Sequence, residues 1–284
     1  MNIVTQNAYA KLNLSLDITK KRADGYHEVS MIMTSCSLCD KITLKKADTI
    51  SLTIENCQSL PLENNLMIKA AKAFFDYTKI NGGAEMHLVK NIPLSAGLAG
   101  GSTDAAAVLR ALNDIYGANL DTRTLCNIAF SLGADVPYCI TGGTYLAEGI
   151  GEKLTYIDKI TDLYAVLVKP GDGLSTAEIY KQTDSEKNLI RPDNTFLIKC
   201  IKEKNYTVLA ENMKNVMEQV SIKQIPQIQI IKDSLLENGA KGAMMSGSGS
   251  CVFGLFLSKQ AADEAAKKLK SSFQNFFVFS AQIL

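Results

Sequence analysis

Residues 93–117, PLSAGLAGGSTDAAAVLRALNDIYG, give the clearest indication of the fold. An alternating segment, Ala84–Val89, precedes it and predicts a strand. From Ala105 onward, apolar residues recur at the spacing of an amphipathic helix, and Gly117 is a typical helix end. The sequence therefore predicts a strand, a glycine-rich loop and a helix in direct succession.

The glycine-rich loop has the composition of a phosphate cradle. Glycines lack a Cβ, so backbone N–H groups can turn toward a bound anion, and a helix that starts at Ser102 or Thr103 would add its positive end. A plain glycine-rich connection, with Ser102 as an ordinary N-cap, is the alternative interpretation.

Two common nucleotide-binding motifs do not fit this loop. A Walker A motif requires a lysine immediately before the hydroxyl residue, where this chain has Gly101. The dinucleotide fingerprint GxGxxG is broken by Gly97-Leu98-Ala99, and no parallel βαβ pattern surrounds it. A different phosphate chemistry is implied.

The pattern on either side of the loop mixes strands and helices. Alternation from Ile3 to Ile54 predicts several antiparallel strands, and helical spacing predicts a helix from Leu66 to Tyr77. Further along, we expect helices over 122–132, 196–204, 208–220, 225–237 and 260–269, and strands over 144–156, 164–169, 251–257 and 276–284. Without strict βαβ alternation, an α+β architecture is favoured over a doubly wound sheet. At 284 residues we expect two domains, 1–155 and 156–284.

Composition excludes several classes of protein. Lys+Arg 30 against Asp+Glu 29 gives a net charge of +1, without the cationic excess of a duplex-binding protein, so no nucleic-acid partner is expected. No window approaches 18 uninterrupted apolar residues, so we expect no membrane span. Seven irregularly spaced cysteines and an N-terminus without a signal-peptide pattern predict the cytoplasm. Cys36 and Cys39 have CxxC spacing without a second pair, so a structural role is favoured.

The loop pattern PxxxGLxGGS(S/T)DAA resembles the phosphate loop of the kinases named for galactose, homoserine, mevalonate and phosphomevalonate. An N-terminal strand carrying Lys11 and the late cluster Ser246–Ser250 match the same superfamily in the same order. This resemblance implies a two-domain α+β small-molecule kinase fold, with an N-terminal domain like ribosomal protein S5 and an α/β C-terminal domain.

A narrower resemblance covers nearly the whole chain. The stretches at residues 8–16, 22–29, 133–137 and 147–152 are similar to the family of kinases that act on 4-diphosphocytidyl-2-C-methyl-D-erythritol. The implied activity is ATP-dependent, in-line phosphorylation of the 2-hydroxyl of that substrate in non-mevalonate isoprenoid synthesis. Ala99 and Thr103 stand where the family commonly has glycine and serine. The alanine puts in doubt whether that position needs a positive φ.

The resemblance implies a set of site residues. Asp135, on a turn before Val-Pro, would be the base for the substrate hydroxyl, and Lys11 would be its cationic partner. ATP would contact Asn65, Pro93, Ser95, Ala96, Gly97, Leu98, Ala99, Gly100, Gly101, Ser102 and Thr103, with Ser102 near Mg²⁺. The cytidylyl substrate would contact Asn13, Tyr26, His27, Ile150, Tyr180, Gly247 and Ser248.

Each of these residues also has a purely structural interpretation. Asp135 could form a turn, Lys11 could be a solvated strand residue, and Asn65 could simply cap a helix. Two other functions stay open: a homoserine or mevalonate kinase, which would lack the Tyr26-His27 base contact, and a nucleotide-binding protein without catalysis. We expect a monomer or weak homodimer.

Overall fold

The computed structural model describes residues 2–57, 60, 62–171 and 173–284. Its strands are β1 (Ile3–Lys21), β2 (His27–Ala47), β3 (Ser51–Glu55), β4 (Gly83–Val89), β5 (Tyr145–Gly149), β6 (Lys153–Tyr156), β7 (Tyr164–Lys169), β8 (Gly242–Met245), β9 (Val252–Phe256) and β10 (Phe277–Gln282). Its helices are α1 (Leu66–Thr78), α2 (Gly100–Tyr116), α3 (Thr122–Phe130), α4 (Val136–Thr141), α5 (Thr176–Thr183), α6 (Asn194–Lys202), α7 (Tyr206–Asn212), α8 (Glu218–Gln224), α9 (Gln227–Glu237) and α10 (Lys259–Ser272). The α+β prediction is confirmed.

The chain forms two compact units, each assembled from separated segments. Unit 1 comprises Met1–Ala10, Leu38–Ile92 and Ala99–Gly142. Unit 2 comprises Lys11–Ser37, Pro93–Leu98 and Gly143–Leu284. Strands β1 and β2, which pair with each other, each contribute to both units. The expected domain boundary after residue 155 stays a prediction.

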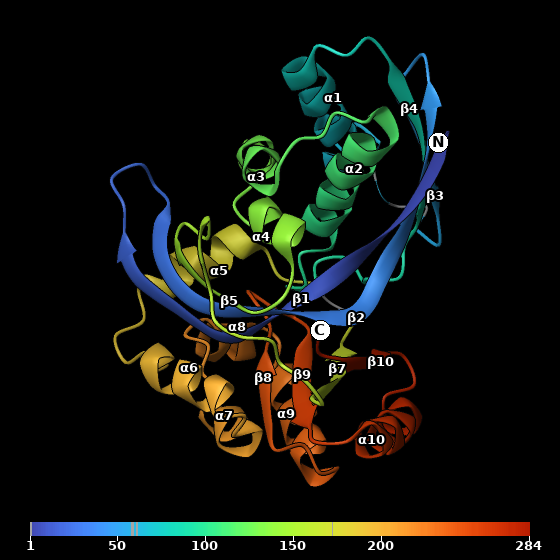
Figure 1. Ribbon diagram of the computed structural model, residues 1–284. Helices are drawn as coiled ribbons and strands as arrows, with labels where there is room; N and C mark the ends of the chain where they lie inside the picture. The colour runs from blue at the N-terminus through green and yellow to red at the C-terminus, as the bar shows by residue number, and fades with distance from the viewer. Residues whose placement is uncertain (1, 58–59, 61, 172) are drawn as a thin grey trace. The chain divides into compact units, whose positions relative to one another are not determined.

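The described part of unit 1 combines a small sheet with helices α1, α2, α3 and α4 (Figure 1). The second half of β2 pairs antiparallel with β4, but β3 pairs parallel with β4, so the expectation of antiparallel strands up to Ile54 is wrong for β3. A parallel pair needs a long crossover, and α1 supplies it between β3 and β4. Helices α1 and α2 pack side by side, with Phe74 and Leu112 among their fully buried side chains.

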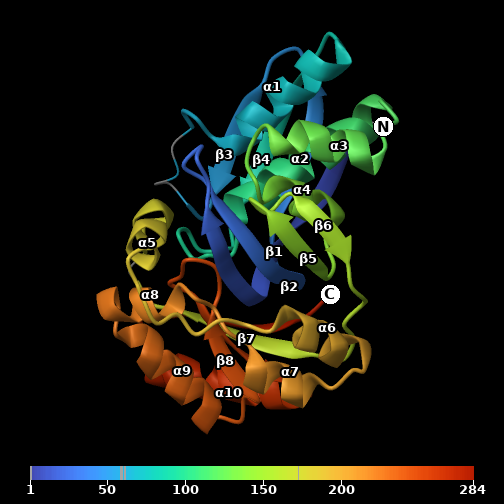
Figure 2. The same ribbon diagram turned by 90° about the vertical axis from the view of Figure 1, so that its left-hand side faces the viewer.

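Unit 2 contains the first half of β2, paired antiparallel with β5, and a second sheet. That sheet has the order β10-β7-β9-β8 with antiparallel neighbours throughout. Helices α9 and α10 pack on it, as Figure 2 shows from the side. Residues of β7 and β9 are buried on both faces, which explains their nearly continuous apolar sequences.

Helix α2, which follows the glycine-rich loop, begins earlier than predicted. α2 starts at Gly100, and its N-cap is Ala99 in the left-handed conformation, with φ +56°. The expected start at Ser102 or Thr103 is wrong, because the Thr103 N–H already donates to the Ala99 carbonyl at 2.9 Å. The Ser102 hydroxyl is therefore not an N-cap, and the predicted helix end at Gly117 is confirmed.

The single helix predicted over 208–220 is also wrong. α7 ends at Asn212 and α8 begins at Glu218, with the non-helical link 213–217 between them. Leu16 of β1 exchanges backbone hydrogen bonds with Lys214 and Val216 on this link. The helical pattern in the sequence is overridden because these backbone groups pair with a strand far away in the sequence.

Candidate active site

The first half of the glycine-rich loop, residues 93–98, lies in unit 2 beside the Gly-Ser cluster. Gly97 has φ +72°, and a Cβ at this position would collide with the Ser246 carbonyl oxygen. The Ser246 hydroxyl donates to the Gly97 carbonyl at 3.1 Å, and the Cys251 N–H donates to the Ala96 carbonyl at 3.3 Å. Only glycine fits at position 97, because two backbone segments meet there.

Lys11 is buried on β1 at 5% exposure, directly against this loop. Its Nζ donates to Asn13 Oδ1 at 2.6 Å and to the Gly97 carbonyl at 2.9 Å. Its backbone N–H donates to the Leu98 carbonyl at 3.2 Å. A lysine buried among hydrogen-bond acceptors places its amino group beside the loop, so the interpretation as a solvated lysine is excluded. Its pairing with Asp135 stays a prediction.

The Gly-Ser cluster, Ser246–Ser250, is fixed by side chains from elsewhere in unit 2. Asn215 Nδ2 donates to the carbonyls of Met245 (2.9 Å) and Gly247 (2.8 Å). The Ser248 hydroxyl lies 2.9 Å from the Thr176 hydroxyl. The predicted contacts of Gly247 and Ser248 with the substrate diphosphate stay predictions. The bonds to Asn215 and Thr176 give the cluster a defined shape.

The second half of the loop, from Ala99 onward, lies in unit 1 at the start of α2. A Cβ at Gly101 would meet only Leu66 Cδ1, at 3.5 Å, so the backbone here is open to a ligand. The first-turn N–H groups and the helix dipole favour an anion at this end. Thr103 is buried, and its hydroxyl donates to the Tyr9 carbonyl at 2.8 Å. Its side chain is therefore structural, whereas Ser102 is only half-buried.

A buried ion cluster anchors this end of α2. Lys90 Nζ donates to Asp40 Oδ2 and, at 2.7 Å, to Asp104 Oδ2. Asp40 Oδ1 also accepts the N–H groups of Asn91 (2.6 Å) and Ile92 (2.7 Å). Asp104 Oδ1 is buried without a hydrogen-bond partner in the described part of the chain. Burial raises the pKa of Asp104 to about 8, although Lys90 opposes the shift.

Asn65 begins α1, next to the start of α2. It is buried, and its Oδ1 accepts the Met67 N–H at 2.9 Å. The capping role is confirmed, and a contact with adenine stays a prediction. Leu66 lies beside Gly101, so α1 and α2 begin close together within unit 1.

Asp135 is the N-cap residue of α4, but its carboxylate makes no capping hydrogen bond. Its backbone carbonyl accepts the Cys139 N–H at 3.2 Å, and the side chain is only half-buried. By contrast, Asp121 uses its carboxylate to accept the Thr124 N–H at 2.8 Å at the start of α3. The Asp135 carboxylate is thus not used to hold its own helix.

Two of the predicted base-binding residues, His27 and Tyr180, meet within unit 2. Tyr26 is 60% exposed on the turn between β1 and β2. The His27 ring stacks on Tyr180, with centroids 4.7 Å apart and planes at 28°. His27 Nε2 lies 2.8 Å from Asp184 Oδ1, and Lys21 donates to Asp184 Oδ2 at 2.7 Å. An aromatic pair with a polar edge is suited to binding a planar heterocycle.

Two other residues predicted to contact the substrate, Ile150 and Asn13, already make hydrogen bonds within the protein. The Ile150 N–H donates to Glu152 Oε2 at 2.7 Å, so only its carbonyl is left for the predicted backbone contact. Asn13 donates its N–H to the Ser246 hydroxyl and its Nδ2 to the Met31 sulfur, both at 3.3 Å. Asn13 therefore ties β1 to the Gly-Ser cluster, whatever else it binds.

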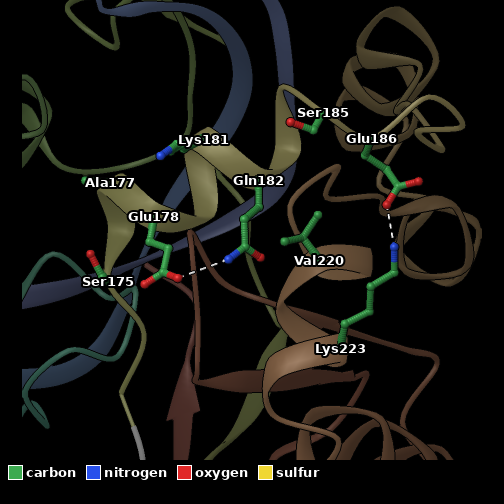
Figure 3. Close-up of a pocket in the computed structure, with 9 residues that line it drawn as sticks. All are labelled: Ser175, Ala177, Glu178, Lys181, Gln182, Ser185, Glu186, Val220 and Lys223. Atoms are coloured by element: carbon green, nitrogen blue, oxygen red, sulfur yellow. Dashed lines mark hydrogen bonds and ion pairs between the residues drawn. The ribbon is translucent and has the colours of Figure 1, made fainter.

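A separate pocket of about 710 Å³ lies between α5 and α8 (Figure 3). It is lined by Ser175, Ala177, Glu178, Lys181, Gln182, Ser185, Glu186, Val220 and Lys223. Its polar groups largely pair with each other: Gln182 donates to Glu178 at 3.1 Å and Lys223 to Glu186 at 2.5 Å. None of the predicted site residues lines this pocket, so we do not assign the substrate to it.

Several functional candidates were not predicted. Asp184 has a weak sequence signal, because it lies four residues after Tyr180 and so on the same side of α5. Asp40, Lys90 and Asn215 have no local signal, because their partners come from other elements.

Among the described residues, no group of three or more His, Cys, Asp or Glu could hold a metal ion, and no helix could cross a membrane.

Comparison with known proteins identifies the family. The model of the GHMP kinases N terminal domain matches residues 65–143, and that of the GHMP kinases C terminal domain matches residues 197–275. The chain is therefore a GHMP kinase, in agreement with the glycine loop and the α+β fold.

Individual relatives narrow this assignment. The chain is 45% identical to 4-diphosphocytidyl-2-C-methyl-D-erythritol kinase of Clostridium tetani, over 95% of this chain and 97% of the relative. It is 46% identical to the kinase of the same name from Acetivibrio thermocellus, over 98% and 99%. The chain belongs to the 4-diphosphocytidyl-2-C-methyl-D-erythritol kinase family.

Solved structures agree in fold. A crystal structure of 4-(cytidine 5'-diphospho)-2C-methyl-D-erythritol kinase matches with a TM-score of 0.83 and 29% identity, covering 99% of both chains. Homoserine kinase from Cytophaga hutchinsonii matches with a TM-score of 0.77 at 20% identity, covering 100% of this chain and 95% of the other. The second match shows only that the fold is shared.

Proposed function

We propose that this protein transfers a phosphoryl group from ATP to the 2-hydroxyl of 4-diphosphocytidyl-2-C-methyl-D-erythritol, a step of non-mevalonate isoprenoid synthesis. The observation that carries the proposal is 45–46% identity, over nearly the full chain, to two curated kinases of that name. The paired Tyr26 and His27 support it, because a nucleobase contact is needed for a cytidylyl substrate and not for homoserine or mevalonate.

The loop and the start of α2 fit a triphosphate. Gly101 leaves the backbone uncovered, and the N–H groups at the start of α2 can donate to an anion. The Ser102 hydroxyl, half-buried in the same turn, is a hard oxygen ligand suited to Mg²⁺. When bound, Mg²⁺ neutralises charge on the phosphoryl oxygens.

Catalysis is assigned to Asp135 and Lys11. Asp135 accepts the proton of the acceptor hydroxyl, because its carboxylate is not used in capping α4. Lys11 supplies a buried positive charge that stabilises the transferring group. Transfer is direct and in line, so no phosphorylated enzyme forms. We further propose a cytoplasmic monomer or weak homodimer.

A coupled assay of ADP formation tests this function. The protein is given ATP and Mg²⁺ with the cytidylyl substrate, homoserine, mevalonate or no acceptor. We expect turnover only with the cytidylyl substrate. Turnover only with homoserine or mevalonate would indicate the corresponding kinase. ATP binding by calorimetry without turnover on any acceptor would indicate a binding protein.

A further inference from the structure

His27 is held by a chain of polar contacts that extends away from Tyr180. Its Nε2 lies 2.8 Å from Asp184 Oδ1, and Asp184 Oδ2 accepts from Lys21 at 2.7 Å. The His27 side chain is only 10% exposed, so its ring is held between the carboxylate and the aromatic face. Within the described part of the chain, Nδ1 makes no hydrogen bond.

The Asp184 carboxylate determines which nitrogen of the His27 ring carries the proton. Partial burial acts to raise the pKa of Asp184, but the hydrogen bonds from Lys21 and His27 outweigh it and hold that pKa below the usual value. An ionised carboxylate only accepts hydrogen bonds, so Nε2 must be the donor. In a neutral imidazole, Nδ1 then carries a lone pair and is an acceptor.

We propose that Asp184 is a positioning residue that sets nucleobase specificity by holding His27 in its Nε2–H form. In this form Nδ1 accepts a hydrogen bond from an exocyclic amino group, such as that of cytosine, and opposes the carbonyl oxygen that uracil has at the same place. The inference rests on the proposed function, because it assumes a pyrimidine beside Tyr26 and His27.

The substitution Asp184→Asn separates this role from simple packing. An amide has nearly the same shape but only one acceptor oxygen. Lys21 is a pure donor and attracts that oxygen, which turns the amide NH₂ toward Nε2. Nε2 then has to accept, and the proton moves to Nδ1. The variant therefore presents a donor where the wild type presents an acceptor.

The tautomer can be measured directly, without activity. The chain has only two histidines, His27 and His87, so ¹⁵N-histidine NMR gives two ring systems, and a His87→Gln variant assigns them. The spectra are followed to alkaline pH until the ring-nitrogen shifts stop changing, so that they report the neutral imidazole. We expect Nε2–H for His27 in the wild type and a shift to Nδ1–H in Asp184→Asn. Nδ1–H in the wild type would overturn the proposal.

The consequence for specificity is measured as kcat/KM for the cytidylyl substrate divided by that for its uridylyl analogue. We expect Asp184→Asn to lower this ratio roughly 10-fold to 100-fold, the size expected for one mismatched buried hydrogen bond, with KM for ATP unchanged. Asp263→Asn is the matched control. Asp263 is also paired with a lysine and a hydrogen-bond donor, Lys259 at 2.6 Å and Ser280 at 2.7 Å, but on α10 and β10.

The two proposals fail in different ways. If the wild type does not phosphorylate the cytidylyl substrate, the proposed function is wrong, and NMR still decides the tautomer. If the wild type is active and Asp184→Asn keeps the wild-type ratio, or changes it no more than Asp263→Asn does, the role of Asp184 is wrong and the function stands.

Discussion

Asp135 is the N-cap residue of α4, but its carboxylate makes no capping hydrogen bond and is left available for chemistry. Replacing it with Asn keeps the shape and removes the proton acceptor. We expect kcat to fall about 10²–10³-fold with little change in KM, because a loose phosphoryl transition state develops limited charge on the attacking oxygen. Steady-state kinetics, with circular dichroism to confirm folding, make the measurement.

Asp121→Asn is the matched control, since Asp121 is also a helix N-cap and asparagine caps equally well. It should keep wild-type kinetics. If a folded Asp135→Asn protein retains more than about a tenth of the wild-type kcat, the general-base role of Asp135 has to be abandoned in favour of substrate-assisted transfer.

Helix α2 places its first turn at the candidate phosphate site, and Gly101 is the residue there whose Cβ position is open. Gly101→Val should weaken ATP binding by about 10-fold or more, because a branched side chain would fill the anion's place, while helix propensity changes little. Gly101→Ala should give a smaller loss. Calorimetry measures both affinities, and unchanged ATP affinity in the folded valine variant would exclude this turn from the site.

The start of α2 is also anchored by two aspartates that hold Lys90 in different ways. Asp40 accepts three hydrogen bonds, whereas Asp104 leaves one buried oxygen without a partner. We expect Asp40→Asn to cost about 3–5 kcal/mol of unfolding free energy, the usual effect of breaking a buried ion pair. Asp104→Asn should cost less than about 1 kcal/mol at about pH 4, and should not destabilise the protein at higher pH, because the folded state retains the proton of this carboxyl, whose pKa is raised to about 8, while the unfolded state loses it.

The pH dependence distinguishes the same two aspartates. A carboxyl whose pKa is raised by folding binds more protons in the folded state, so stability falls as pH rises from about 4 to about 8. Asp104→Asn should lack this decline. Urea unfolding at several pH values measures it. Equal losses for the two variants at every pH would contradict the assignment of the proton to Asp104.

The stability of unit 2 depends on Asn215, because this residue joins segments that are distant in the sequence. Its side-chain Nδ2 donates to the carbonyls of Met245 and Gly247, and its Oδ1 accepts the Met217 N–H. Its backbone forms a β-bridge with Leu16. Asn215→Ala should lower the unfolding free energy by about 2–4 kcal/mol, because buried carbonyls lose their donor. Asn212→Ala, which removes an exposed side chain that donates to the Val208 carbonyl, should change the unfolding free energy by about 0.5 kcal/mol or less. Similar urea midpoints for both variants would refute this role.

Features that depend on neighbouring residues could be predicted from the amino-acid sequence. Helical spacing located α1, the segment that meets Pro170-Gly171 located β7 from Tyr164 to Lys169, Gly117 marked the end of α2, and the glycine loop identified the superfamily. Periodicity and capping act within a few residues, so they can be read along the chain. The start of α2 was misplaced because Ala99 adopts a left-handed conformation that its residue type does not favour.

Which distant residues meet could not be predicted from the sequence and is seen in the folded chain. His27 and Asp184 lie 157 positions apart, and Gly97 and Ser246 lie 149 apart, yet each pair is in hydrogen-bond contact. The break between α7 and α8 arises in the same way, because the strand residue Leu16 takes the backbone groups that a helix would use. Such contacts form once the apolar faces of strands and helices are buried, and burial depends on the whole chain rather than on any local segment.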